Sequence, residues 1–270
     1  MPMSVKTFAQ VDEAARALAA SRSARYLGGG TLIMRAVNYG DQSFDTIIRT
    51  TDPRLKQIAQ QGDMLVIGAG ITMSEVIANR ETAFLAPVAR TVGGPAIRNM
   101  ATVGGNLFAA SPYGDFTAAL LALDARVVPA GGQPISLDEF LNARERNAGL
   151  VIVSVQIPRL RDVNAFRYVK VSRVKPKGIA VMSIAAVLPM QAGRLANARV
   201  AYGAMGPRPL RALAVERALE GRSLDEAGIA QALAVATEGV DPPSDPIASD
   251  WYRRQIAPVH LKRLLLGQRR

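Results

Sequence analysis

Hydrophobic and polar positions in the first half of the chain follow the periods of both helices and strands. Apolar residues at helical spacing over 11–20 predict a helix, and 24-ARYL-27 predicts a short strand that runs into a glycine loop. The other β-type runs predict strands at 46–49, 64–69, 126–129 and 150–158. Further helices are predicted at 73–79, 84–91 and 115–125. Capping boxes of the form S/T-x-x-E are expected at 72–75, 136–139 and 223–226.

After Pro158 the chain becomes charged and turn-prone at 159-RLRDVNA-165, which predicts a domain boundary near residue 161. Beyond it, alternating runs at 165–171, 181–190 and 198–205 predict three strands of an antiparallel sheet. Helical spacing then predicts helices around 209–219, 224–238 and 251–265. The order of these elements indicates an α+β protein with domains at 1–161 and 162–270.

Composition narrows the classes of protein that the chain can represent. It has 270 residues, 49% of them hydrophobic, which is enough for sizeable cores. The absence of cysteine excludes disulfides, a cysteine nucleophile and an iron–sulfur cluster held by this chain. The chain has a single histidine, His260, so a histidine metal site or a Ser-His-Asp triad is not expected. No run approaches the roughly 18 apolar residues that span a bilayer, and the N-terminus lacks a secretory signal pattern, so we expect a cytoplasmic protein.

The net charge of +11 raises the question of nucleic-acid binding. Arginines are spread over the chain, however, and the densest basic stretch, 159–177, is interrupted by apolar residues rather than by a series of stacking aromatics. We therefore expect no nucleic-acid partner. A solvated surface, or a basic face toward an acidic protein or an anionic cofactor, explains the charge.

Two glycine loops carry the candidate chemistry. Gly28, Gly29 and Gly30 follow a predicted strand and precede Thr31, and a second loop combines bare backbone with short polar side chains in 102-TVGGN-106. Glycine-rich backbone can wrap an anion with its amides, although a lone GGG is more often an ordinary turn. Neither loop has the Walker or GxGxxG pattern. Two such loops together favour one extended ligand with a pyrophosphate.

Asp115 follows the second loop, at the start of a predicted helix. Its carboxylate can cap the amides of its own helix, or it can accept a hydrogen bond from a ligand hydroxyl. The sequence alone leaves these two roles open.

Four motifs, 27-LGGGT-31, 101-ATVGGN-106, 111-SPYGD-115 and 121-LALDA-125, together resemble the FAD-binding subunit of the molybdenum hydroxylases, the xanthine dehydrogenase and carbon monoxide dehydrogenase family. The resemblance extends through 151–158 and 166–188, so it covers the whole chain. It implies a two-subdomain FAD-binding domain of the vanillyl-alcohol-oxidase (PCMH) type, with subdomains of about 1–55 and 56–161. A C-terminal domain, 162–270, with a three-stranded antiparallel sheet and a helix bundle would cover the flavin.

The resemblance also implies which residues contact FAD. The segment that would wrap the pyrophosphate consists of Tyr26, Leu27, Gly28, Gly29, Gly30, Thr31, Leu32 and Ile33, together with Thr102, Gly104, Gly105 and Asn106. Asp115 would contact the adenosine ribose or nearby polar groups, Ile152 would pack against the cofactor, and Lys170 would reach the flavin ring. A shift of one residue in strand register would place Val169 there instead. The segment 174-VKPKGIA-180 departs from the family because it is basic where many relatives carry an acidic residue.

By resemblance, the chain is the FAD-carrying electron-transfer subunit of a multi-subunit molybdenum hydroxylase. A large molybdopterin subunit would oxidise the substrate, and [2Fe–2S] clusters of a small subunit would deliver electrons to FAD in this chain. FAD would pass them to a terminal acceptor, and the complex would be a dimer of heterotrimers. Two alternatives stay open at this point. One is a self-contained FAD-dependent oxidase, and the other is a basic module that binds a nucleotide or nucleic acid without redox function.

Overall fold

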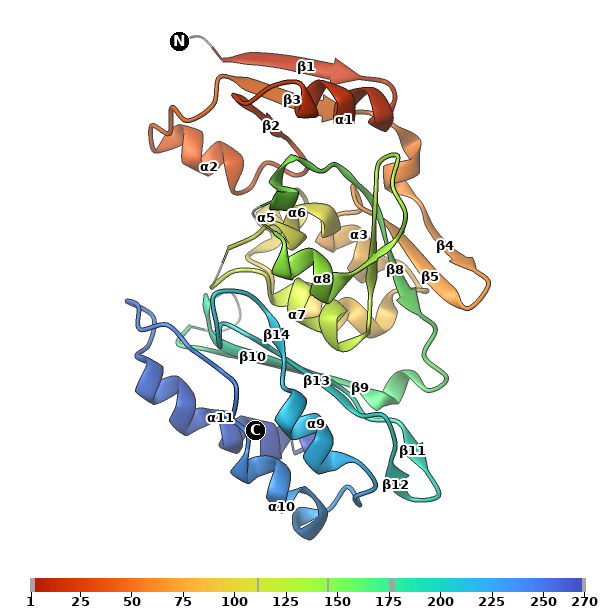
Figure 1. Ribbon diagram of the computed structural model, residues 1–270, viewed down its shortest axis with the longest axis vertical. Helices are drawn as coiled ribbons and strands as arrows, with labels where there is room; N and C mark the ends of the chain where they lie inside the picture. The colour runs from red at the N-terminus through yellow and green to blue at the C-terminus, as the bar shows by residue number, and fades with distance from the viewer. Residues whose placement is uncertain (1–2, 111, 145, 175–177, 269–270) are drawn as a thin grey trace. The chain divides into compact units, whose positions relative to one another are not determined.

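The computed structural model describes residues 3–110, 112–144, 146–174 and 178–268, so positions 175–177 of the basic segment lie outside the described residues. The chain forms two units, each built from two stretches of sequence. The first unit consists of Met1–Ala109 and Ala125–Arg159, and the second of Ala110–Asp124 and Leu160–Arg270. The segment Ala110–Asp124 therefore belongs to the second unit. The domain boundary predicted near residue 161 stays a prediction from the sequence. Figure 1 shows both units, with labels on most of the helices and strands.

The first unit contains a parallel and an antiparallel sheet. The parallel sheet has the order β1 (Ser4–Phe8), β3 (Thr46–Thr50) and β2 (Ala24–Tyr26). The antiparallel sheet has the order β4 (Ile58–Gln61), β5 (Met64–Gly68), β8 (Ile152–Pro158), β6 (Arg126–Pro129) and β7 (Ile135–Ser136). The five strands predicted in this half are confirmed, and β1, β4 and β7 were missed. The missed strands are short or largely exposed, so their sequences lack a clear apolar alternation.

Short helices connect the strands of the first unit. They are α1 (Val11–Ala19), α2 (Ile33–Asn38), η1 (Pro53–Lys56), α3 (Met73–Ala78), η2 (Ala83–Leu85), α4 (Ala86–Ala89), α5 (Pro95–Arg98), α6 (Val103–Leu107), α8 (Leu137–Asn142) and η3 (Arg146–Gly149). The continuous helix predicted at 84–91 is wrong, because the structure has a 3₁₀ turn followed by a short α-helix that contains Pro87. Proline has no N–H to donate within a longer helix.

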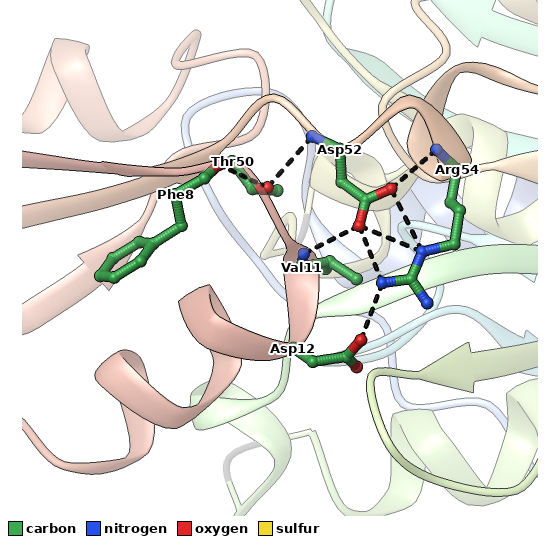
Figure 2. Close-up of polar contacts among 6 residues, drawn as sticks. All are labelled: Phe8, Val11, Asp12, Thr50, Asp52 and Arg54. Atoms are coloured by element: carbon green, nitrogen blue, oxygen red, sulfur yellow. Dashed lines mark hydrogen bonds and ion pairs between the residues drawn. The ribbon is translucent and has the colours of Figure 1, made fainter.

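The start of α1 is held by a carboxylate from a distant segment (Figure 2). Gln10 makes no side-chain cap, and the Val11 N–H instead donates to Asp52 Oδ2 at 2.9 Å. Arg54 donates to Asp52 through both its backbone and its guanidinium, and Arg54 Nη2 also donates to Asp12 Oδ2 at 2.7 Å. These hydrogen bonds, those from the Arg54 side chain foremost, hold the pKa of the buried Asp52 well below its usual range. Asp52 thus joins η1 to the first turn of α1.

The second unit is built on an antiparallel sheet in the order β14 (Leu210–Arg211), β13 (Arg199–Gly203), β10 (Ala180–Val187) and β9 (Phe166–Ser172). The three predicted strands are confirmed, and the two-residue β14 extends the sheet. A small hairpin, β11 (Met190–Gln191) and β12 (Arg194–Leu195), follows β10, and η4 (Val163–Ala165) precedes β9. Helix α7 (Asp115–Ala122), whose eight residues are all buried, packs on β10 and β13.

Three C-terminal helices complete the second unit: α9 (Leu213–Leu219), α10 (Glu226–Ala234) and α11 (Asp250–Leu265). They share a core with alternate residues of the sheet, among them Met182, Ile184 and Tyr202. Each of the three predicted regions contains a helix, but the first helix begins later than predicted because Leu210–Arg211 form β14, and the second ends at Ala234. The capping box expected at 223–226 is wrong. Asp225 is the N-cap of α10 and accepts from the Gly228 N–H at 2.8 Å, so the helix begins at Glu226.

Candidate functional site

The first glycine loop offers a row of unused amides. It leaves β2 at Tyr26 and enters α2 at Ile33, and Gly30 has a φ of 75° that favours glycine. Within the described part of the chain, the backbone N–H groups of Gly28, Gly29, Gly30 and Thr31 donate to no acceptor. Consecutive unpaired amides in such a turn are typical of an anion-binding concavity.

The second glycine loop is different, because its amides are already used. The Val103 N–H donates to Ile71 O and the Gly104 N–H to Ala69 O, both at 2.8 Å. The Gly105 N–H donates to Thr102 Oγ1 at 3.0 Å, and the Asn106 N–H donates to Thr102 O. Thr102 is the N-cap of α6. These amides therefore already have acceptors within the first unit, and the contact of this loop with a ligand stays a prediction.

The two loops meet within the first unit. A Cβ at Gly29 would overlap the backbone carbonyl of Met100, so only glycine permits this approach. A Cβ at Gly28 and a Cβ at Gly105 would each lie 3.0 Å from Thr102 Oγ1. Gly28 and Gly105 are both exposed, whereas Thr102 is buried, so side chains placed at the two glycines would crowd the same buried hydroxyl. The two loops therefore lie side by side, and their joint role toward one ligand stays a prediction.

Gly104 has a structural role that its sequence motif did not reveal. The residue is buried, and a Cβ there would lie 2.8 Å from the Cβ of Ala69 and 3.0 Å from its carbonyl oxygen. Glycine at this position lets α6 pack directly on the end of β5. Gly104 and Gly105 therefore serve different purposes although they are adjacent.

Two further residues of the first unit that were predicted to contact a cofactor, Tyr26 and Ile152, are half-buried and buried, respectively. Tyr26 is half-buried, and burial, with a contribution from the charge of Asp52, raises the pKa of its hydroxyl to about 12. Ile152 is buried at the start of β8, where it pairs with Pro129. The structure thus places Tyr26 at the entrance to the first loop and Ile152 in the core of the sheet.

In the second unit, Asp115 and Lys170 form an ion pair with each other. Lys170 Nζ lies 2.7 Å from Asp115 Oδ2, and the two side chains are 7% and 9% exposed. Asp115 lies in the first turn of α7, whose N-cap position is occupied by Gly114 without a side-chain cap. Burial raises the pKa of Asp115, and the charge of Lys170 opposes that rise. The sequence left open whether Asp115 caps its helix or contacts a ligand. It did not predict the ion pair with Lys170.

The register of β9 against β10 places Lys170 directly opposite Ser183. Val169 is opposite Ile184, and Val169 packs against the core shared with the C-terminal helices. Lys170 therefore faces the α7 side of the sheet while Val169 faces the other side.

Among the described residues, no group of three or more His, Asp or Glu side chains could hold a metal ion, and no described helix combines the length and apolar character needed to cross a membrane.

An α+β unit in which two glycine loops meet, one of them with unpaired amides, is typical of a nucleotide-binding protein. Residues 2–160 match the family model of the FAD-binding domain in molybdopterin dehydrogenase, and residues 167–267 match that of the CO dehydrogenase flavoprotein C-terminal domain. The chain belongs to this family of FAD-binding oxidoreductase subunits, and FAD is its cofactor. The resemblance found in the sequence is confirmed.

Individual relatives agree with the family. The chain is 25% identical over 260 residues to the glyceraldehyde dehydrogenase medium chain of Sulfolobus acidocaldarius, with 92% of each chain covered. Quinoline 2-oxidoreductase from Pseudomonas putida 86 contains a chain with a TM-score of 0.87 and 26% identity, covering 99% of this chain and 96% of that one. Carbon monoxide dehydrogenase from Hydrogenophaga pseudoflava contains one with a TM-score of 0.91 at 24% identity, covering 98% and 96%, a likeness of fold.

Proposed function

We propose that this chain is the electron-transfer subunit of a multi-subunit molybdenum hydroxylase. In this proposal a small subunit with [2Fe–2S] clusters delivers electrons, a large molybdopterin subunit oxidises the organic substrate, and the complex is a dimer of heterotrimers. The relatives support it, because they include medium chains and FAD subunits of dehydrogenases named for several different substrates. Such variety fits a chain that handles electrons rather than the substrate. When bound, FAD supplies the redox chemistry, accepting single electrons and releasing them in pairs.

The observation that carries the proposal is the set of unpaired amides at Gly28 to Thr31. A pyrophosphate is a doubly charged acceptor with oxygens that several amides can contact at once, and the loop's bare backbone permits a close approach. The exposed Gly105 next to Gly28 keeps that approach open. The residues present therefore fit the FAD pyrophosphate, with the first loop as the donor and the second loop as its support.

The other proposed contacts follow the resemblance found in the sequence. In the first unit we assign Tyr26, Leu27, Leu32 and Ile33 to the walls of the first loop, Thr102 and Asn106 to polar contacts, and Ile152 to apolar packing. In the second unit we assign Asp115 and Lys170. Since these two residues already pair in the structure, a ligand that contacts either one must compete with or extend their ion pair.

The experiment that tests the proposal uses the isolated subunit loaded with FAD. We expect no flavin reduction by aldehydes, purines or other heteroaromatic compounds, but complete reduction by dithionite. Adding the small and large partner subunits should then produce substrate-dependent flavin reduction in stopped-flow absorbance. Part of the net charge of +11 should contribute to docking, so added salt should slow assembly. Rapid reduction by an organic substrate without partners would instead establish a self-contained oxidase. A colourless protein that cannot take up FAD would leave the non-redox nucleotide-binding alternative.

A further inference from the structure

Ser183 carries a buried hydroxyl that has no role in the proposed cofactor contacts. It lies in β10, the residue is 0% exposed, and its Oγ has no hydrogen-bond partner within the described part of the chain. A buried polar group without a partner is costly, and such groups are rare in native proteins. We therefore expect a state of the protein in which the Ser183 hydroxyl forms a hydrogen bond.

The surroundings of Ser183 show that room is kept for this hydroxyl. Its cross-strand neighbours are Lys170 on β9 and Gly203 on β13. A Cβ at Gly203 would overlap Ser183 Oγ and would also lie 3.4 Å from the Cβ of Ala118 on α7. Glycine at position 203 thus leaves space for the Ser183 hydroxyl between the sheet and α7. A larger residue at position 203 would occupy that space.

Three polar side chains from three elements converge in this space. Asp115 comes from α7, Lys170 from β9 and Ser183 from β10, and Lys170 already donates to Asp115 Oδ2. The Ser183 hydroxyl lies near enough to lower the pKa of Asp115, although no hydrogen bond is formed. An ionised carboxylate can accept about four hydrogen bonds. Asp115 therefore has capacity for a second donor beside Lys170.

We propose that Ser183 is a positioning residue that donates its hydroxyl to Asp115 when bound FAD draws the Lys170 ammonium away from that carboxylate. This inference rests on the proposed function, in which Lys170 contacts the cofactor. An ammonium shared with an anionic ligand neutralises Asp115 less completely, and a buried carboxylate without a donor is strongly disfavoured. Rotation of the serine about its Cα–Cβ bond brings the donor in without any movement of the backbone.

The test compares Ser183→Ala with the wild type and with Ser154→Ala, which removes another buried hydroxyl, from β8 of the first unit. FAD affinity is measured by quenching of flavin fluorescence, and the stability of the FAD-free protein by thermal unfolding. Ser183→Ala should bind FAD about tenfold more weakly, because a hydrogen bond to a charged group is lost only in the loaded state. The unfolding temperature of FAD-free Ser183→Ala should stay unchanged or rise, because the substitution removes a buried hydroxyl that makes no hydrogen bond in this state.

A second arm needs no FAD. In a Lys170→Met background the Ser183 hydroxyl is the donor left for Asp115, so adding Ser183→Ala should lower the unfolding temperature there and not in the wild-type background. Equal FAD affinity for Ser183→Ala and the wild type overturns the inference, and so does a Ser183→Ala protein that fails to fold without FAD. A wild type that does not bind FAD would contradict the proposed function itself, so the two failures are distinguishable.

Discussion

Lys170 Nζ lies 2.7 Å from Asp115 Oδ2, and this ion pair joins strand β9 to helix α7 with both side chains more than nine-tenths buried. The sequence motif assigns the two residues to separate parts of a cofactor. The structure shows that they also depend on each other, because each is the buried counter-charge of the other. Any substitution of one residue therefore acts on the stability of the second unit as well as on the cofactor.

Removing one member of this pair should destabilise the protein strongly. We expect Asp115→Ala to lower the free energy of unfolding of the FAD-free protein by about 3–5 kcal/mol, because the buried Lys170 ammonium loses its carboxylate partner. The double variant Asp115→Ala/Lys170→Met should be more stable than Asp115→Ala. Urea unfolding measures both. Lys262→Ala, which removes an exposed ion pair with Glu226, is the control and should cost less than about 1 kcal/mol. Equal losses in Asp115→Ala and the control would contradict the interpretation.

The adjacent glycines of the second loop should respond differently to substitution by alanine. Gly104→Ala should destabilise the first unit by about 1–3 kcal/mol, because its Cβ collides with Ala69. Gly105→Ala lies in an exposed helical position, but its Cβ would lie 3.0 Å from Thr102 Oγ1. The higher helix propensity of alanine offsets that close contact, so we expect the unfolding free energy to change by less than about 1 kcal/mol. FAD titration should nevertheless show weaker binding for Gly105→Ala. If both variants lose stability but retain FAD affinity, the exposed surface at Gly28 and Gly105 is not part of the cofactor site.

The buried carboxylate of Asp52 predicts a pH dependence of the first unit. Its pKa is lowered in the folded state, so it binds fewer protons there than in the unfolded chain, where an aspartate has a pKa of about 3.9. The stability it contributes is fully present above that value and is lost as the pH falls toward the folded-state pKa. Urea midpoints between pH 7 and pH 3 should fall more steeply for the wild type than for Asp52→Asn. Parallel curves would show that Asp52 does not contribute to acid sensitivity.

Arg253 is the fully buried arginine of α11, and its loss should be severe. It donates to both carboxylate oxygens of Asp245 at 3.0 Å, to Val181 O at 2.9 Å and to Pro243 O. Arg253→Leu removes the donor to Val181 O and Pro243 O. It also removes the counter-charge of Asp245, which would still accept from the Ile247 and Ala248 N–H groups. We therefore expect the unfolding free energy to fall by about 3–5 kcal/mol. Arg217→Ala is the matched control, because Arg217 is 70% exposed and lies 3.9 Å from Glu238, and it should change stability by less than about 0.5 kcal/mol. Similar chemical unfolding of both variants would contradict this prediction.

Local signals in the sequence were reliable where the partner was also local. Thr72 and Glu75 form the predicted reciprocal capping box, since both groups lie within one turn of α3. The same pattern at 223–226 failed because Asp225 provides a carboxylate cap two residues later. Strand β1 was missed for a different reason, since four of its five residues are exposed and its pairing partner β3 begins far along the chain at Thr46.

The sequence by itself determined the family, the cofactor class, the positions of the glycine loops and most of the long strands and helices. These follow from motifs, periodicity and backbone preferences, which are properties of neighbouring residues. The tertiary structure decided which glycine amides stay unpaired, which glycine serves packing, and that Asp115, Lys170 and Ser183 share one buried space. Those outcomes depend on hydrogen-bond partners, burial and counter-charges supplied by segments remote in sequence, and no local pattern records which remote group arrives.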